Sequence, residues 1–170
     1  MLMNHTISLP SKVSNHGFSL LEVLVTILLV SFGLLGMAAL VVSGVRSNNV
    51  AYYRSVASKQ TEDIADRMRA NIAGVTAGAY DALTENIPSS VDCMASVCSE
   101  FQIATYDHAQ WNTANSLLLP DGRGSVIGNL AAGYSITLMW TEKEMNNEAD
   151  QNCPGGTTTN TRCFVTRFAP

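Results

Sequence analysis

Residues 18–45 read FSLLEVLVTILLVSFGLLGMAALVVSGV, and the rest of the chain is organised around this stretch. Its 28 residues contain one charged side chain, Glu22. As a helix the stretch would be about 42 Å long, which exceeds the roughly 30 Å hydrocarbon core of a bilayer. The sequence therefore predicts one membrane-spanning helix, and the polar, mixed residues from Arg46 onward predict a water-soluble part.

Helical periodicity continues beyond the apolar stretch, through residues 46–73. Apolar side chains recur there at multiples of three and four, which predicts an amphipathic helix with one apolar stripe: Val50, Ala57, Ile64, Met68 and Ile72. Such a stripe needs a partner surface, and the residues that follow are the simplest one. Gly74 and Gly78 are stop signals, so we expect one long helix over residues 18–73.

Residues 74–170 predict a small globular head. After a loop at 75–100, the spacing of Phe101, Ala104, His108, Trp111 and Leu118 predicts a helix over 101–119. Segments 124–130 and 133–142 read as strands, 143–161 as a loop, and the ending CFVTRFAP as a last strand. The second strand should place Tyr134, Ile136, Leu138 and Trp140 on one face. A long helix followed by a small antiparallel sheet is an α+β fold.

Four cysteines, Cys93, Cys98, Cys153 and Cys163, all lie beyond the apolar stretch. An even number in the polar part indicates disulfides formed in an oxidising compartment. Three connectivities are possible, and proximity favours Cys93–Cys98 with Cys153–Cys163. Zinc is the less favoured alternative, because the C-x9-C pair is widely spaced and His108 is the one histidine beyond the apolar stretch.

Composition argues against several function classes. A net charge of −4 disfavours nucleic acid, and the basic residues of 46–69 alternate with acids as on a solvated helix face. Asp107-His108 could suggest acid–base chemistry, but no nucleophile motif such as G-x-S-x-G accompanies the pair. Trp111 and Trp140 are better explained as core aromatics than as stacking platforms. We therefore expect no enzyme activity, no metal and no cofactor.

The residues that precede and open the apolar stretch, Gly17-Phe18-Ser19-Leu20-Leu21-Glu22, form a specific pattern. G-F-[ST]-L-x-E before about twenty apolar residues resembles the N-terminus of type IV pilins and pseudopilins. The resemblance implies a type IV pilin-like fold, and cleavage between Gly17 and Phe18 by a membrane-embedded prepilin peptidase. It also implies that residues 1–17 are a leader peptide and that Phe18 becomes N-methylated. Lys12, with His5 and His16, gives a weak positive-inside bias toward a cytoplasmic leader.

Glu22 then has a physical explanation. Cleavage would create a positive amine on Phe18 beside the apolar core, where an unpaired charge is costly. Glu22 lies one helical turn away and could neutralise its own terminus. The resemblance favours pairing with the amine of a neighbouring subunit, which would set register during assembly. In the membrane, Glu22 could instead lie near the headgroups and reach water.

Three further segments resemble the PilV type of minor pilin: 33–40, 55–71 and 105–126, as does the strand GYSITLMW before a cysteine-flanked loop. The resemblance implies a minor pilin, held in the bacterial inner membrane with a periplasmic head and then transferred to the type IV pilus. It would prime or modify assembly and so affect twitching motility, adhesion or DNA uptake. Expected partners are prepilin peptidase, other major and minor pilins, the inner-membrane assembly platform and, before assembly, membrane lipid.

Two alternatives remain at this point. A minor pseudopilin of a type II secretion system would share the processing motif and the helix. A membrane-anchored binding protein, such as an adhesin, would use the helix only as an anchor. On the minor-pilin interpretation, the chain divides into four parts. These are the leader 1–17, the transmembrane and filament-core helix 18–45, the amphipathic half of the long helix 46–73 and the head 74–170.

Overall fold

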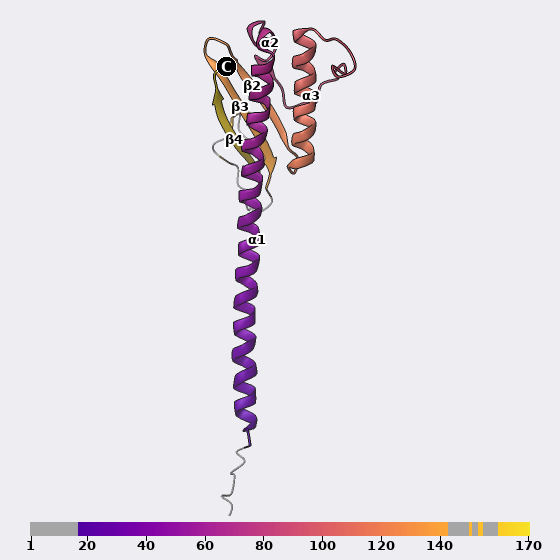
Figure 1. The fold of residues 1–170 in the computed structure, drawn as a ribbon. Helices are drawn as coiled ribbons and strands as arrows, with labels where there is room; N and C mark the ends of the chain where they lie inside the picture. Colours follow the sequence, from indigo (N-terminus) through magenta and orange to yellow (C-terminus); the bar gives the residue numbers. More distant parts are fainter. Residues whose placement is uncertain (1–16, 143–149, 151–152, 155–159) are drawn as a thin grey trace, which may run out of the picture. The chain divides into compact units, whose positions relative to one another are not determined.

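The computed structural model describes residues 17–142, 150, 153–154 and 160–170. The chain forms two compact units, Met1–Gly44 and Val45–Pro170, and helix α1, Leu20–Ala70, runs through the boundary (Figure 1). The expected leader, 1–17, lies outside the described residues except for Gly17, and so does most of the expected loop 143–161. The architecture is the predicted α+β pattern, a long N-terminal helix and a small antiparallel sheet, as in type IV pilins.

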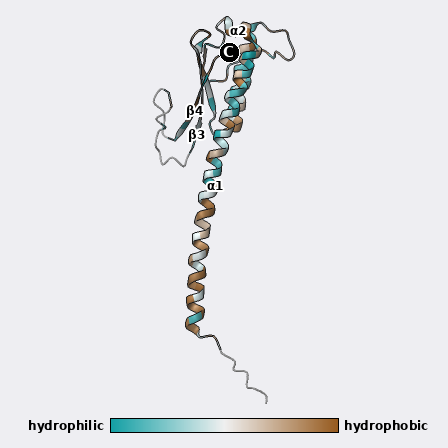
Figure 2. Ribbon diagram, turned by 60° about the vertical axis from the view of Figure 1, so that its left-hand side comes forward, coloured by the Kyte–Doolittle hydropathy of each residue, from teal (hydrophilic) through white to brown (hydrophobic). Residues whose placement is uncertain are grey.

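The described part of the N-terminal unit is a single apolar helical segment, coloured brown over most of its length in Figure 2. All its side chains are exposed, from Leu20 to Gly44. The hydroxyls of Thr26 and Ser31 donate to the carbonyls of Val23 and Ile27, at 2.8 and 2.7 Å, so these polar groups are satisfied inside the helix. Among the described helices, α1 alone is long and apolar enough to cross a membrane.

The C-terminal unit contains a four-stranded antiparallel sheet in the order β1-β2-β3-β4. Its strands are Ala82–Leu83, Arg123–Asn129, Gly133–Thr141 and Thr161–Phe168. The last three are the predicted strands, displaced by one or two residues at some ends. β1 was not predicted, because two residues that pair only with Ile127 and Val126 carry no alternating pattern of their own.

One face of this sheet carries the core. Of the predicted stripe, Val50 is partly exposed and Ile72 is half exposed. Ala57, Ile64 and Met68 are completely buried. They pack with the inward side chains of the sheet and of helix α3, Glu100–Leu118: Val126, Tyr134, Ile136, Leu138, Ala104 and Trp111. The amphipathic half of the long helix therefore buries its apolar face within its own chain, as the sequence predicted.

The long helix ends earlier than predicted, at Ala70 instead of residue 73. Asn71 leaves the helical conformation, and its side-chain oxygen accepts from Gly74 N–H at 3.2 Å to begin α2, Ile72–Thr76. Its amide nitrogen donates to Glu100 O at 2.9 Å, which fastens the start of α3 beside the end of α1. Asparagine favours such capping positions over a helix interior, because its side chain bonds to nearby backbone groups. This preference explains why α1 ends before Asn71.

Neighbouring side chains in the sequence cap the start of α3. Ser99 accepts from Gln102 N–H, and the Gln102 side chain accepts from Ser99 N–H at 2.9 Å, a complete capping box. Further along α3, the Trp111 ring lies against Gly124 of β2, where any β-carbon would collide with it. Phe101 and Leu118, which belong to the helical spacing in the sequence, are about half exposed at 52% and 44%.

Strand β3 departs from simple alternation in its second half. Tyr134, Ile136, Leu138 and Trp140 are buried as predicted, but Thr137 and Met139 on the opposite face are buried too. Met139 pairs with Cys163, which is disulfide-bonded to Cys153. Cross-strand neighbours and the disulfide therefore cover part of the sheet face that alternation alone would leave in water.

Candidate processing and assembly site

Ser19 organises the start of α1. Its carbonyl accepts from the backbone N–H groups of Glu22 and Val23, at 3.1 and 3.3 Å, and its hydroxyl accepts from Glu22 N–H at 3.3 Å. Ser19 thus acts as the N-cap of the helix that begins at Leu20. Sequence reasoning missed this role, although the S-x-x-E spacing of residues 19–22 is a recognised capping pattern.

Gly17 has no folding role in the described structure. A β-carbon built on it would meet nothing within 4 Å, and its φ angle is not in the left-handed region. Gly17 and Phe18 precede the helix, and Phe18 is 83% exposed. The peptide bond between them is therefore accessible, and no contact among the described residues requires glycine at position 17.

Glu22 is the third residue of α1 and is exposed. A carboxylate in a first turn is favoured by the positive end of the helix dipole. A free amine on Phe18 would add a second positive charge at the same end, about 6 Å away along the helix axis. Because Glu22 is the single charged side chain of residues 18–45, it is the carboxylate that this stretch offers to such an amine.

Both disulfides lie in the C-terminal unit. Cys93 is bonded to Cys98 and Cys153 to Cys163, with Cα–Cα distances of 5.6 and 5.2 Å. These are the two pairs that sequence proximity favours. Within the described residues, no group of three or more His, Cys, Asp or Glu side chains is placed to hold a metal ion.

The charged residues near the end of α1 are structural. Arg69 pairs with Asp66 on the helix surface, and Arg67 pairs with Asp63, as an exposed helix face predicts. Arg67 also reaches Asp107 of α3 at 3.3 Å, a contact that sequence reasoning missed. Burial lowers the pKa of Arg67, but its bonds to Asp63 and Asp107 outweigh this effect and raise it.

Asp107 and His108, the pair considered for acid–base chemistry, have separate partners. Asp107 accepts from Tyr80 OH at 2.6 Å, and burial together with this bond raises the pKa of Tyr80. His108 Nε2 lies 2.7 Å from Thr84 O, and burial lowers its pKa although this bond partly opposes the shift. The two side chains therefore tie α3 to Tyr80 and Thr84, and they do not face a shared substrate position in these contacts.

The two tryptophans are core residues, as predicted. Trp111 is fully buried and donates from Nε1 to Gln60 O of α1 at 2.8 Å, while Trp140 is 2% exposed. Neither ring therefore offers the exposed face that a stacking platform requires.

Comparison with known protein families places one motif on the chain. Residues 12–38 match the prokaryotic N-terminal methylation motif. No curated protein and no solved structure matches the chain. The match covers Gly17, Phe18, Ser19 and Glu22 and most of the apolar stretch. The chain thus carries a prepilin-type N-terminus, which indicates a type IV pilin or pseudopilin and supports a place in the type IV pilin-like family. The motif implies processing by prepilin peptidase and assembly with other pilins.

Proposed function

We propose that this protein is a minor type IV pilin of the PilV type, which primes or modifies pilus assembly. The observation that carries the proposal is the accessible Gly17–Phe18 bond within the methylation motif, directly before an apolar helix. Gly17 contacts nothing that would explain it, whereas a peptidase that approaches the backbone closely would require it.

The exposed apolar part of α1 supports an assembly role. Leu20 to Gly44 has no buried residue in the described chain, so this surface needs either lipid or other protein around it. A bilayer would surround the helix with lipid, and a bundle of similar helices would surround it with protein. Because both environments are apolar, transfer between them changes little hydrophobic energy, and polar contacts can direct it.

Glu22 and the Phe18 amine are the polar groups available for that purpose. An amine and a carboxylate inside an apolar bundle are costly when unpaired, so a subunit that pairs them would be favoured over one in the wrong register. The pair thus gives assembly a defined axial position. In the membrane form, Glu22 would lie near the headgroups, where water can solvate it.

The disulfides support the proposed location. Cys93–Cys98 and Cys153–Cys163 both lie beyond the span, and such bonds persist in an oxidising compartment. This favours a single-pass protein of the inner membrane with its C-terminal unit in the periplasm, later carried into the pilus.

The test is substitution of Gly17. In cells with prepilin peptidase, Gly17→Val should keep residues 1–17 and migrate as the longer form, because a branched β-carbon obstructs backbone approach. Gly36→Val is the matched control, since its β-carbon also meets no atom within 4 Å, and it should be processed normally. A wild-type chain that also retains residues 1–17 in these cells would instead indicate a plain anchored binding protein and exclude the proposal.

A minor pseudopilin of a type II secretion system is the second candidate, because the same N-terminal motif serves both systems. Fractionation separates the two. A pilin should be recovered with sheared surface fibres, and its deletion should alter twitching, adhesion or DNA uptake. A pseudopilin should be missing from those fibres, and its deletion should block release of secreted enzymes.

A further inference from the structure

Helix α1 begins just after the proposed cleavage point. Gly17, Phe18 and Ser19 lie outside the helix, which starts at Leu20. Among the described residues, no backbone N–H donates to the carbonyl of Gly17 or of Phe18. The first carbonyl that accepts such a bond is that of Ser19. The Gly17 carbonyl is therefore free of the helical hydrogen-bond ladder.

The freedom of this carbonyl matters because cleavage is an attack on it. The oxygen of a water molecule adds to the Gly17 carbonyl carbon, and the bond to the Phe18 nitrogen breaks. The two protons of the water pass to that nitrogen, which leaves a carboxylate on Gly17 and a protonated amine on Phe18. If α1 began one turn earlier, the Gly17 oxygen would accept from Leu21 N–H inside a helix. The starting point of α1 thus decides whether a peptidase can reach the bond.

Ser19 is the residue that sets this starting point. Its hydroxyl accepts from Glu22 N–H at 3.3 Å, and its carbonyl accepts from the N–H groups of Glu22 and Val23. Serine favours a capping position over a helix interior, because its hydroxyl competes there for backbone groups. Gly17 works in the same direction, since glycine is the poorest helix former after proline.

The sequence before the cleavage point contains a competing helix start. Ser14 and Asn15 belong to the same class of capping residues as Ser19. A helix that began directly after Asn15 would include Gly17 and Phe18 in its first turn. A good cap at Ser19 favours the shorter helix, because the start whose N–H groups are better satisfied has the lower free energy.

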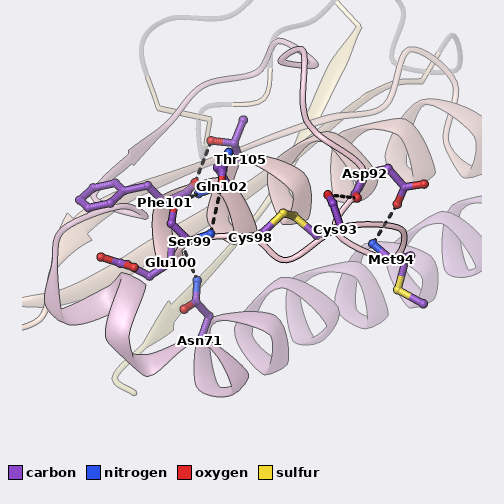
Figure 3. The surroundings of a disulfide bond; sticks show 11 residues. Asn71, Asp92, Cys93, Met94, Cys98, Ser99, Glu100, Phe101, Gln102 and Thr105 are labelled. Atoms are coloured by element: carbon purple, nitrogen blue, oxygen red, sulfur yellow. Dashed lines mark hydrogen bonds between the residues drawn. A yellow bond between two sulfur atoms is a disulfide. The ribbon is translucent and has the colours of Figure 1, made fainter.

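The cap at Ser19 differs from the cap at Ser99 of α3. At Ser99 the Gln102 side chain accepts from the capping residue's N–H at 2.9 Å, which completes a capping box (Figure 3). Glu22 holds the corresponding position in α1, but its carboxylate makes no such bond within the described chain. Ser19 therefore holds the backbone of Glu22 and leaves its carboxylate available to an amine.

We propose that Ser19 is a positioning residue for cleavage: as the N-cap of α1, it holds the Gly17–Phe18 bond outside the helix, where the peptidase can reach it. The proposal rests on the proposed function in requiring cleavage at this bond. Ser19 acts through the helix start, so it changes the fraction of molecules whose bond is accessible. Loss of the cap should raise KM and leave kcat nearly unchanged, because the peptidase binds only the accessible fraction.

Cleavage kinetics of the full chain test the proposal. Purified uncleaved protein in detergent micelles is mixed with prepilin peptidase, and removal of residues 1–17 is followed by mass spectrometry. Ser19→Ala should raise KM about fivefold, the factor that corresponds to loss of a typical N-cap. Ser19→Asn should stay within about twofold of the wild type, since asparagine caps as well as serine but has no hydroxyl.

Ser31→Ala is the matched control. It makes the same chemical change on α1, where the Ser31 hydroxyl donates to Ile27 O at 2.7 Å and caps nothing, so KM should not change. Three kinetic outcomes would overturn the proposal. Wild-type kinetics in Ser19→Ala would show that the cap has no part in cleavage. Equal losses in Ser19→Ala and Ser19→Asn, or a fall in kcat at unchanged KM, would show that the peptidase contacts the hydroxyl directly.

Hydrogen exchange of the Leu21 amide reports the helix start itself. Within the described residues Leu21 N–H has no acceptor, whereas a helix that began earlier would bond it to the Gly17 carbonyl. NMR of the full chain labelled with ¹⁵N-leucine, in micelles without peptidase, measures this exchange. It should slow by a similar factor in Ser19→Ala and not in Ser19→Asn. Unchanged exchange in a slowly cleaved Ser19→Ala would contradict the assigned mechanism.

Failure of the proposed function gives a different result. A wild-type chain that keeps residues 1–17, with a peptidase that is active on another prepilin, would reject cleavage after Gly17 and the proposed function with it. A cleaved wild type with the same kinetics in Ser19→Ala would reject only the role of Ser19.

Discussion

At the scale of single residues, the contacts within the fold explain neither Glu22 nor Gly17. Asp107, His108 and Asn71 each have named partners that explain them within the fold. Gly17 contacts nothing within 4 Å of its β-carbon position, and Glu22 is a lone exposed charge in an apolar helix. On the proposed function, both residues act through contact with another molecule.

Glu22→Gln should separate processing from assembly. The glutamine amide has the size of the carboxylate but no charge to neutralise the Phe18 amine. We therefore expect normal cleavage after Gly17. The amount of the protein in fibres should fall by at least about tenfold, because a buried amine without its counter-charge is costly. Quantitative immunoblots of membrane and sheared-fibre fractions measure it. Glu62→Gln, an exposed α1 acid, is the control. Wild-type recovery of Glu22→Gln in fibres would show that the pair does not direct assembly.

Gly124 is the residue at which packing requires glycine. A β-carbon there would collide with the Trp111 ring, so Gly124→Ala should destabilise the C-terminal unit by about 1–3 kcal/mol. The midpoint of urea unfolding, followed by tryptophan fluorescence of the detergent-solubilised full chain, measures this. Gly36→Ala makes the same chemical change in open space and should leave the midpoint unchanged. Equal midpoints for all three proteins would contradict the packing.

At the scale of elements, α3 is the piece that holds the C-terminal unit together. Arg67 and Tyr80 bind Asp107, Thr84 lies against His108, and Asn112 bonds both ways with Gly124 of β2, at 2.8 and 3.0 Å. These polar contacts are buried or partly buried, so each group depends on its partner. The helix thereby connects α1, the segment around β1 and the sheet.

His108 makes this connection sensitive to pH. Burial lowers its folded pKa below the unfolded value of 6.5, so between the two values the unfolded chain binds more protons. Stability is then fully present above about pH 7 and falls as pH drops through 6.5 toward the folded pKa. Urea midpoints between pH 7.5 and 5.5 should show this fall, and His108→Gln should flatten it. His5 and His16 are present in both proteins, so their contributions to the pH dependence cancel. An equal change of midpoint with pH in His108→Gln would contradict the role of His108.

How far sequence reasoning succeeded depended on whether a signal was local. The apolar run, the stripe through Ile64 and Met68, and the strand alternation at Tyr134 are local patterns, and they predicted α1, its buried face and β3. β1 and the burial of Met139 arise from pairing with distant segments, which no local pattern reports. The end of α1 at Ala70 depended on the Asn71 side chain, whose partner Glu100 lies 29 residues away.

The candidate site divides in the same way. Gly17, Phe18 and Glu22 could be named from a contiguous motif, and the family comparison found that motif on residues 12–38. Ser19 was missed although its capping pattern is local, because the motif already accounted for the segment. The Arg67–Asp107 contact spans 40 residues and could not be predicted from helix periodicity.

At the scale of the whole molecule, the chain combines an apolar helix exposed on all sides with a disulfide-braced unit that buries its own core. The first needs other molecules to cover it, and the second does not. Such a division suits a subunit that waits in a membrane and is later packed by its helix into a fibre.

The central claim is that this helix acquires a new, methylated amino terminus and enters a fibre. Intact-mass and peptide mass spectrometry of fibres sheared from cells with working prepilin peptidase tests it most directly. The account predicts a chain that begins at N-methylated Phe18, carries both disulfides and co-purifies with the fibres. A fibre-associated or membrane-bound chain that retains residues 1–17 in those cells would contradict it.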